Sequence, residues 1–241
     1  MTSPEPMVAT PKGGLFEDLI EVLFAPAKVF DRSRAAKAFK YALVLAVIAA
    51  AITFGTKNLV QPWYDAQGDL ALAAAAAKGT PMPEGASSAI RATTAWGIVA
   101  GAPLLMLIGP YFNALFIMIG AKLMRANINF RQAAVVATLA GVPRLLGLIF
   151  MPVQALLTDG ANAKSLYDLS VGPGRFLDMT KMSPAIMALV GQLDVFRLWQ
   201  LALVAIGVAV VSRASMSTAA IISLIMAAIA AMFQLVPAAF A

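Results

Sequence analysis

The chain has 241 residues, of which 61% are hydrophobic and only 12% charged, and it carries a net charge of +6. Water-soluble domains carry about 25% charged residues, so this composition excludes an ordinary soluble fold. The sequence holds neither His nor Cys, which removes the commonest general base and every thiolate. We therefore expect no catalytic centre, no metal site and no cofactor.

The N-terminal region is expected to lie outside the membrane core. Residues 1–14 are rich in Pro, Gly and small polar side chains, which is typical of a disordered tail. In the next stretch, apolar residues recur at helical spacing opposite three acids: Phe16, Leu19, Ile20, Leu23, Ala27 and Phe30. The stretch is too short and too polar to cross a bilayer, so it predicts an amphipathic helix in the membrane interface, broken near Pro26.

A basic cluster completes this interfacial segment, which we assign to residues 15–38. Its cations are interrupted by a single acid, Asp31, and comprise Lys28, Arg32, Arg34, Lys37 and Lys40. Such a cluster suits anionic headgroups, and it also orients a membrane protein with this end in the cytoplasm. We favour orientation over specific lipid recognition. Because the cations gather beside helix ends, we expect no nucleic-acid binding.

Long uncharged runs predict the membrane crossings. A helix needs about 20 apolar residues to cross a hydrocarbon core of roughly 30 Å. The sequence therefore predicts an all-α membrane bundle over residues 39–241, with five transmembrane helices near 39–60, 92–121, 132–157, 195–211 and 215–236. The segment between the first two is expected to be a loop with one short helix. Excess Lys and Arg places the N-terminus in the cytoplasm and the C-terminus outside.

Arg144 is the one charge deep inside an apolar run, directly after Pro143. An arginine at such a depth costs about 2.5–3.5 kcal/mol on insertion scales, so its side chain should face protein or water. It can sit at a helix end made by Pro143 and extend toward the interface, pair with Asp194, or contact an anion or lipid headgroup. We favour the two structural interpretations over a ligand site.

The segment Asp194, Arg197 and Trp199 opens the fourth crossing. A carboxylate at a helix start suits the positive end of the helix dipole, and an indole soon after suits headgroup depth. Arg197 can reach outward to phosphates or back to Asp178 or Asp194. These positions predict an outer anchor that presents the loop 158–192 to a partner, or interfacial anchoring with no partner.

The fifth crossing carries a stripe of small residues at every fourth position: Ser215, Ala219, Ser223, Ala227 and Ala231. Such a stripe allows helices to approach closely. It predicts packing within the bundle, or against another subunit or a second copy of the chain.

Several of these motifs carry a resemblance to a known family. They are the stretch 15–32 with Pro26 and Phe30, Phe130-Arg131-Gln132 running into Pro143, Val171-Gly172-Pro173 before Phe176-Leu177, and the segment from Asp194 to Trp199 followed by Gly207. With them the chain resembles, from residue 14 to 235, the bacterial branch of the Yip (Ypt-interacting protein) domain family. The resemblance implies five transmembrane helices and no known enzymatic activity. Eukaryotic relatives act in vesicle trafficking with Rab-type GTPases, and some bacterial relatives are associated with ABC exporters.

Three functions follow as hypotheses. We favour a non-catalytic scaffold or accessory subunit of the bacterial inner membrane that contacts lipids and other helices, including those of an ABC exporter. The alternative is a transporter or channel for a small or lipidic solute, which crossings interrupted by Pro favour. An intramembrane enzyme is disfavoured by the missing His and Cys. A closed bundle without a polar cavity would favour the scaffold over the transporter.

Overall fold

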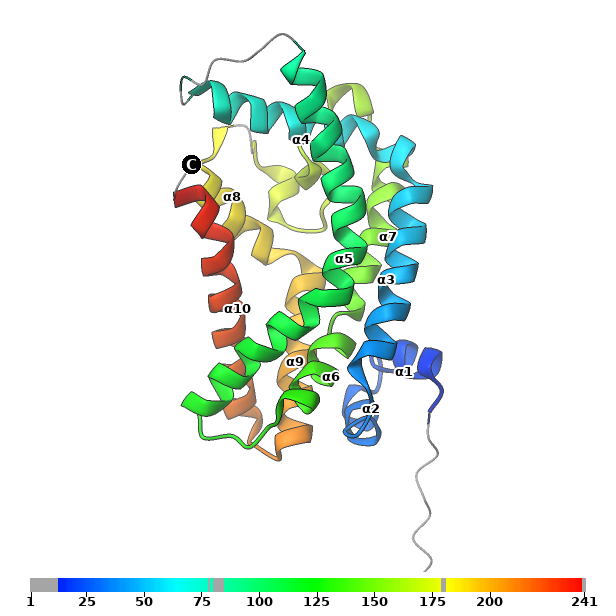
Figure 1. Ribbon diagram of the computed structural model, residues 1–241, viewed down its shortest axis with the longest axis vertical. Coiled ribbons are helices and arrows are strands. Elements are labelled where there is room, and N and C mark those ends of the chain that lie inside the picture. Colours follow the sequence, from blue (N-terminus) through cyan, green and yellow to red (C-terminus); the bar gives the residue numbers. More distant parts are fainter. Residues whose placement is uncertain (1–12, 78, 80–84, 179–180, 240–241) are drawn as a thin grey trace, which may run out of the picture.

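The computed structural model describes residues 13–77, 79, 85–178 and 181–239, and this part of the chain contains helices and no strand. Figure 1 shows an elongated bundle with one helix, α4, lying across its end. Five helical stretches are long and apolar enough to span a membrane, which confirms the predicted membrane bundle. They are α3 (Ala38–Gly55), α5 (Ala86–Leu123), α6 with α7 (Phe130–Leu157), α9 (Val195–Ser212) and α10 (Met216–Ala239).

The first crossing is shorter than predicted, because α3 ends at Gly55 rather than near residue 60. The expected loop is instead α4 (Lys57–Ala77), a helix of 21 residues. Its apolar side chains Val60, Trp63 and Tyr64 are buried, in a second core that is separate from the main one. Pro62 and scattered polar residues interrupt the apolar pattern here, so tertiary packing rather than periodicity defines this helix.

The second crossing is longer than the predicted 92–121. Helix α5 has 38 residues, with Pro103 and Pro110 inside it, and its length of about 57 Å exceeds a hydrocarbon core of about 30 Å. Its first turns therefore extend past the core and pack on α4, where Arg91 forms an ion pair with Asp69 at 2.7 Å. Figure 1 shows α5 bending along its length.

The third crossing is two helices, α6 (Phe130–Leu139) and α7 (Val142–Leu157). The break near Pro143 is confirmed, since Pro in a first helical turn needs no N–H partner. The start of α6 is a capping box, in which the Asn129 side chain accepts from Gln132 N at 3.0 Å and the Gln132 side chain accepts from Asn129 N at 3.1 Å.

The N-terminal segment forms two short helices, α1 (Leu15–Glu21) and α2 (Pro26–Arg32), so the break at Pro26 is confirmed. Leu19 and Phe30 are buried in the main core, whereas Phe16 and Ile20 are 65% and 63% exposed. The bundle therefore buries part of the apolar face that we assigned to the interface. Contact of the remaining part with the membrane stays a prediction, and the tail 1–14 lies almost wholly outside the described residues.

Arg32 is held inside this segment by two acids. Its guanidinium lies 2.6 Å from Asp18 and 2.5 Å from Glu21, and its side chain is 7% exposed. Hydrogen bonds from Lys28 and then Arg32 hold the pKa of the Glu21 carboxyl below its usual 4.5. Much of the predicted basic cluster is thus paired within the protein, while Lys37 and Lys40 remain exposed.

Gly207 in α9 is the point where the N-terminal segment meets the bundle. A Cβ at this position would lie 2.7 Å from Val136 Cγ1 of α6 and 3.0 Å from Phe30 Cζ of α2. Only a hydrogen fits there, because real Cβ atoms do not approach this closely.

We expect Gly207→Ala to lower stability by about 1–3 kcal/mol, because the methyl overpacks a buried contact although Ala is the better helix former. The matched control is Gly97→Ala in α5, which has open space around its Cβ and should be neutral or up to about 1 kcal/mol stabilising. Denaturant unfolding in a mild detergent, followed by circular dichroism, measures both. Equal effects of the two variants would contradict the close contact.

Candidate functional site

The segment between α7 and α9 folds into the bundle and forms one wall of the candidate site. It is built from short helices, which are η1 (Gly160–Asn162), η2 (Leu166–Leu169), η3 (Pro173–Phe176), α8 (Pro184–Val190) and η5 (Gly191–Leu193). Ser165 and Leu169 are 0% and 1% exposed, while Phe176 is 85% exposed. The predicted partner-contacting loop 158–192 is therefore partly enclosed by the chain's own helices.

Asp194 fastens this segment to α9. One carboxylate oxygen accepts from Phe196 N at 2.9 Å and caps the helix, and the other accepts from Val171 N at 3.1 Å. Gly172 allows this approach, because its Cβ would lie 3.1 Å from the Cα of Asp194. The prediction that Asp194 lies at a helix start is thus confirmed, because its side chain is the N-cap of α9.

Tyr167 fills the space next to this anchor. Its hydroxyl donates to the Met187 carbonyl at 3.1 Å, and Gly174 and Gly191 leave room for its ring. Burial raises the pKa of Tyr167 above its usual value of 10.0, so the phenol stays protonated and remains a donor at neutral pH.

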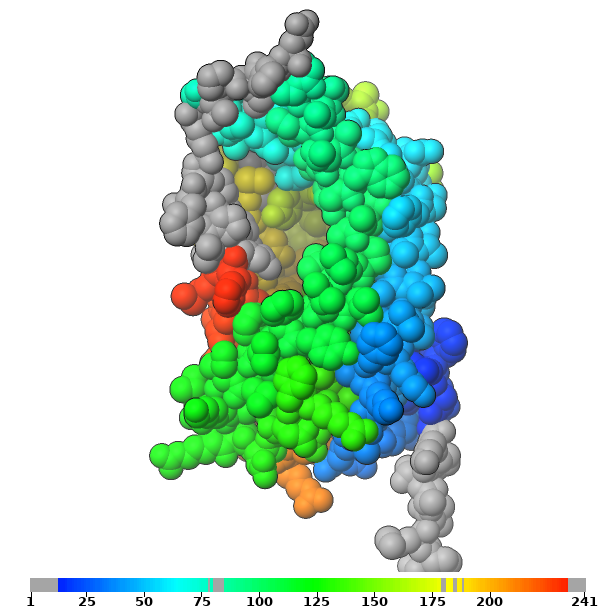
Figure 2. Space-filling model, viewed as in Figure 1, coloured from blue at the N-terminus to red at the C-terminus, as the bar shows by residue number. Residues whose placement is uncertain are grey.

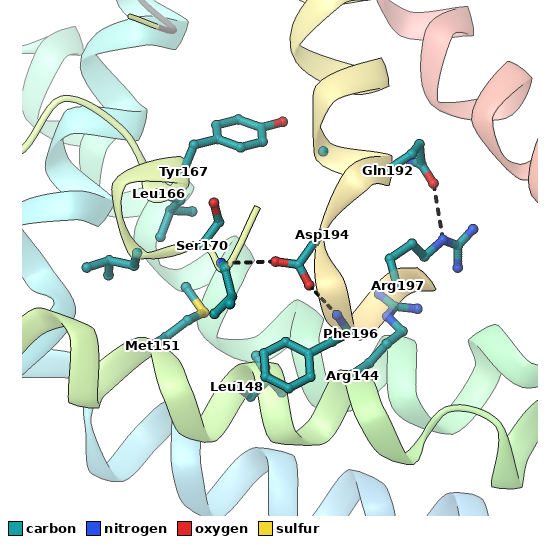
Figure 3. Close-up of a pocket in the computed structure, with 14 residues that line it drawn as sticks. Arg144, Leu148, Met151, Leu166, Tyr167, Ser170, Gln192, Asp194, Phe196 and Arg197 are labelled. Carbon is teal, nitrogen blue, oxygen red and sulfur yellow. Dashed lines mark hydrogen bonds between the residues drawn. The ribbon is translucent and has the colours of Figure 1, made fainter. Parts of the chain in front are cut away.

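A cavity of about 370 Å³ lies between α7, α9 and this segment (Figure 3). Its apolar wall includes Leu148, Met151, Leu169 and Phe196. Its polar lining includes two arginines, a hydroxyl and an amide, which are Arg144, Arg197, Ser170 and Gln192. The Ser170 hydroxyl oxygen is buried and has no hydrogen-bond partner in the described part of the chain.

Arg197 is oriented by two neutral amides. Its Nε donates to Gln192 Oε1 at 3.1 Å, and its Nη1 donates to Gln200 Oε1 at 2.7 Å. The predicted pairing with Asp178 or Asp194 is not among the ion pairs that the structure shows for the described residues. The guanidinium is therefore held beside the cavity by neutral acceptors.

Arg144 lies in the first turn of α7 and lines the same cavity, as Figure 3 shows. Its side chain makes no hydrogen bond or ion pair with any described residue. The proposed pair with Asp194 is not formed, because both carboxylate oxygens accept from backbone N–H groups. The like charges of Arg144 and Arg197 repel each other, so an anion between them would be stabilised.

The other predicted site residues pack within the bundle. Trp199 is half-buried against the main core. On α10, Ala219 and Ser223 are buried, and the Ser223 hydroxyl donates to the Leu201 carbonyl of α9 at 2.7 Å. Ser215 is exposed at the helix start, while Ala227 and Ala231 are partly buried. The middle of the small-residue stripe therefore contacts the chain's own helices.

Ser170 and the two amides that hold Arg197 were not among the predicted site residues. Gln200 follows Arg197 by three residues, a spacing at which helical side chains meet, so this contact had a sequence signal. Gln192 and Ser170 had none, because the fold of the segment 158–193 brings them to the cavity.

We expect Asp194→Ala to lower stability by about 1–2 kcal/mol, because α9 loses its cap and Val171 N loses its acceptor. Asp194→Asn keeps one oxygen for the cap and should lose clearly less. Chemical denaturation of the detergent-solubilised chain compares the two variants. Equal losses for Ala and Asn would show that negative charge, rather than hydrogen-bond geometry, is what matters.

Comparison with known proteins places this arrangement in a family. The Yip1 domain model matches residues 20–236, which include α2, the five membrane crossings and the cavity. No curated protein and no solved structure gives a significant match. The match extends over most of the chain and agrees with the five apolar helices, so the chain belongs to the Yip1 domain family.

Proposed function

We propose that this protein is a non-catalytic membrane protein that binds an anionic ligand between Arg144 and Arg197. One observation carries the proposal: two guanidinium groups line a single cavity in the membrane bundle, and neither pairs with a carboxylate in the described residues. The function that fits best is therefore the handling of a small or lipidic solute, the alternative that we set beside a scaffold.

The physical argument is one of charge compensation. An arginine inside a membrane bundle is unfavourable unless it meets water, a counter-charge or an acceptor. A guanidinium fork matches the oxygens of a phosphate or carboxylate and binds them in pairs. The cavity volume of about 370 Å³ is within the range of about 300–1,000 Å³ that is usual for small ligands.

The placement of the cations supports the expected orientation in a bacterial inner membrane. Exposed Lys37, Lys40, Arg125 and Arg131 lie near the helix ends opposite α4. The positive-inside rule assigns that end to the cytoplasm. The cavity, at the start of α9, then belongs to the outer half of the bundle.

A second candidate function is an accessory subunit of an ABC exporter. Helix α4 and the first turns of α5 form a pair that extends beyond the membrane core and is held by the Arg91–Asp69 ion pair. This pair favours the accessory role because it offers a surface outside the bilayer to a partner. Gly68 allows this close approach, since its Cβ would lie 2.9 Å from the Cα of Arg91.

The accessory role predicts a partner at α4. Because the chain has no Cys, Ala73→Cys introduces a single thiol on the exposed side of α4, to which a photoactivatable crosslinker can be attached. Ala51→Cys introduces the same thiol on the exposed side of α3 as a control. We expect Ala73→Cys in intact membranes to crosslink to a second polypeptide and Ala51→Cys not to. An absence of crosslinks from Ala73→Cys and its neighbours Ala74→Cys and Ala77→Cys would refute this role.

The anion-binding proposal predicts a specific stabilisation by phosphate. In neutral detergent, inorganic phosphate should raise the thermal midpoint of the protein more than chloride does at the same ionic strength. Arg144→Gln and Arg197→Gln should lose this difference, whereas Lys122→Gln, at the far end of α5, should keep it. A phosphate effect that is unchanged in both arginine variants would contradict the proposed site.

A further inference from the structure

A second cavity of about 480 Å³ adjoins the first one. The two share part of their lining, namely Leu166, Tyr167, Ser170, Gly191 and Asp194. The second cavity also reaches Ile98 of α5, Gln67 of α4 and Val190 of α8. The two cavities are therefore adjacent spaces that lead from the arginines toward α5.

This second space opens sideways. Figure 2 shows a hollow beside α5 and below α4, with the coloured part of α10 beneath it and the segment between α7 and α9 visible inside. The view crosses the long axis of the bundle, so the hollow faces the direction from which lipids approach. Its mouth lies beside Ile98, within the uncharged run of α5.

The mouth exists because α10 packs against the C-terminal part of α5. Gly120 of α5 lies against Ile222 of α10, since a Cβ on Gly120 would lie 3.1 Å from Ile222 Cγ2. The rings of Phe116 and Phe233 stack with their centroids 5.5 Å apart. Pro103 and Pro110 lie within α5, on the N-terminal side of these contacts, and proline is a common cause of helix bends. The N-terminal part of α5 therefore turns away from α10.

We propose that the ligand is an anionic phospholipid that enters the cavity laterally from the outer half of the bilayer. This inference rests on the proposed function, since it names the ligand of the same arginine pair. The phosphodiester lies between Arg144 and Arg197. The acyl chains follow the apolar wall and leave through the mouth at Ile98.

Three features favour a lipid over a soluble anion. The opening faces the membrane side of the bundle. The wall next to the arginines is apolar, through Leu148, Met151 and Phe196, and it would leave a small hydrophilic anion without partners on that side. The described lining holds two arginines and one carboxylate, Asp194, whose oxygens accept from backbone N–H groups rather than from the arginines. The remaining formal charge of +1 favours lipids with a net negative charge.

The test measures which lipid stays with the protein. Purified protein is exchanged into neutral detergent with equal amounts of phosphatidylglycerol and phosphatidylcholine, and the retained lipid is identified by native mass spectrometry. We expect retained phosphatidylglycerol, at an affinity about 10- to 100-fold above that for phosphatidylcholine. Arg144→Gln and Arg197→Gln should each lose that preference, and Lys122→Gln should retain it.

Two further variants test the lateral route. Ile98→Trp and Val190→Trp narrow the mouth from α5 and from α8, while Leu104→Trp adds the same bulk on an exposed face of α5. We expect each mouth variant that elutes as a folded monodisperse species to lose retained phosphatidylglycerol, and Leu104→Trp to keep it. Retention by both mouth variants would overturn the lateral route.

The outcomes separate this inference from the proposed function. A wild-type protein that is stabilised by inorganic phosphate but retains no phosphatidylglycerol would overturn the lipid assignment and leave the anion site standing. A protein that responds to neither probe would overturn both.

Discussion

Asp194 uses both of its carboxylate oxygens on backbone N–H groups, and the half of the molecule that holds the cavity depends on this arrangement. One bond caps α9 and the other holds the preceding segment at Val171. Because the one carboxylate among the described lining residues is engaged in this way, neither Arg144 nor Arg197 forms an ion pair with it. The structural role of Asp194 thereby leaves both guanidinium groups available to an anion, in a lining whose described residues carry a formal charge of +1.

The amides complete this electrostatic arrangement. Gln192 and Gln200 accept hydrogen bonds from Arg197, which fixes the guanidinium without neutralising it. Carboxylates at those positions would form a closed ion pair, and the cavity would then have little attraction for an anion. Three features separate this cavity from an ordinary buried polar cluster: neutral acceptors for Arg197, an acid engaged by backbone groups, and an Arg144 that has no partner among the described residues.

The features that could be predicted from the sequence are those encoded by local pattern. Uncharged runs identify membrane helices because a bilayer demands about 20 consecutive apolar residues, and Pro143 and Asp194 mark a helix break and a helix start by their own chemistry. Helix α4 was missed because Pro62 and polar residues hide its apolar face until α5 packs against it. The partners of Arg197 and the position of Ser170 depend on how the segment 158–193 folds back, which no spacing in the chain records.

The packing of Phe30 against Gly207 and Val136 has a consequence for the order of assembly. Phe30 leaves the ribosome first, and its binding pocket is incomplete until α6 and then α9 have been synthesised and inserted. The same delay applies to Arg34, whose side chain donates to the Val210 carbonyl at a separation of 176 residues. The N-terminal helices can therefore dock only after α9 has been inserted, although they are made before it. In the interval Phe16, Ile20 and the still unburied Phe30 form one apolar face, which would keep the nascent N-terminus at the membrane surface close to the place where it finally docks.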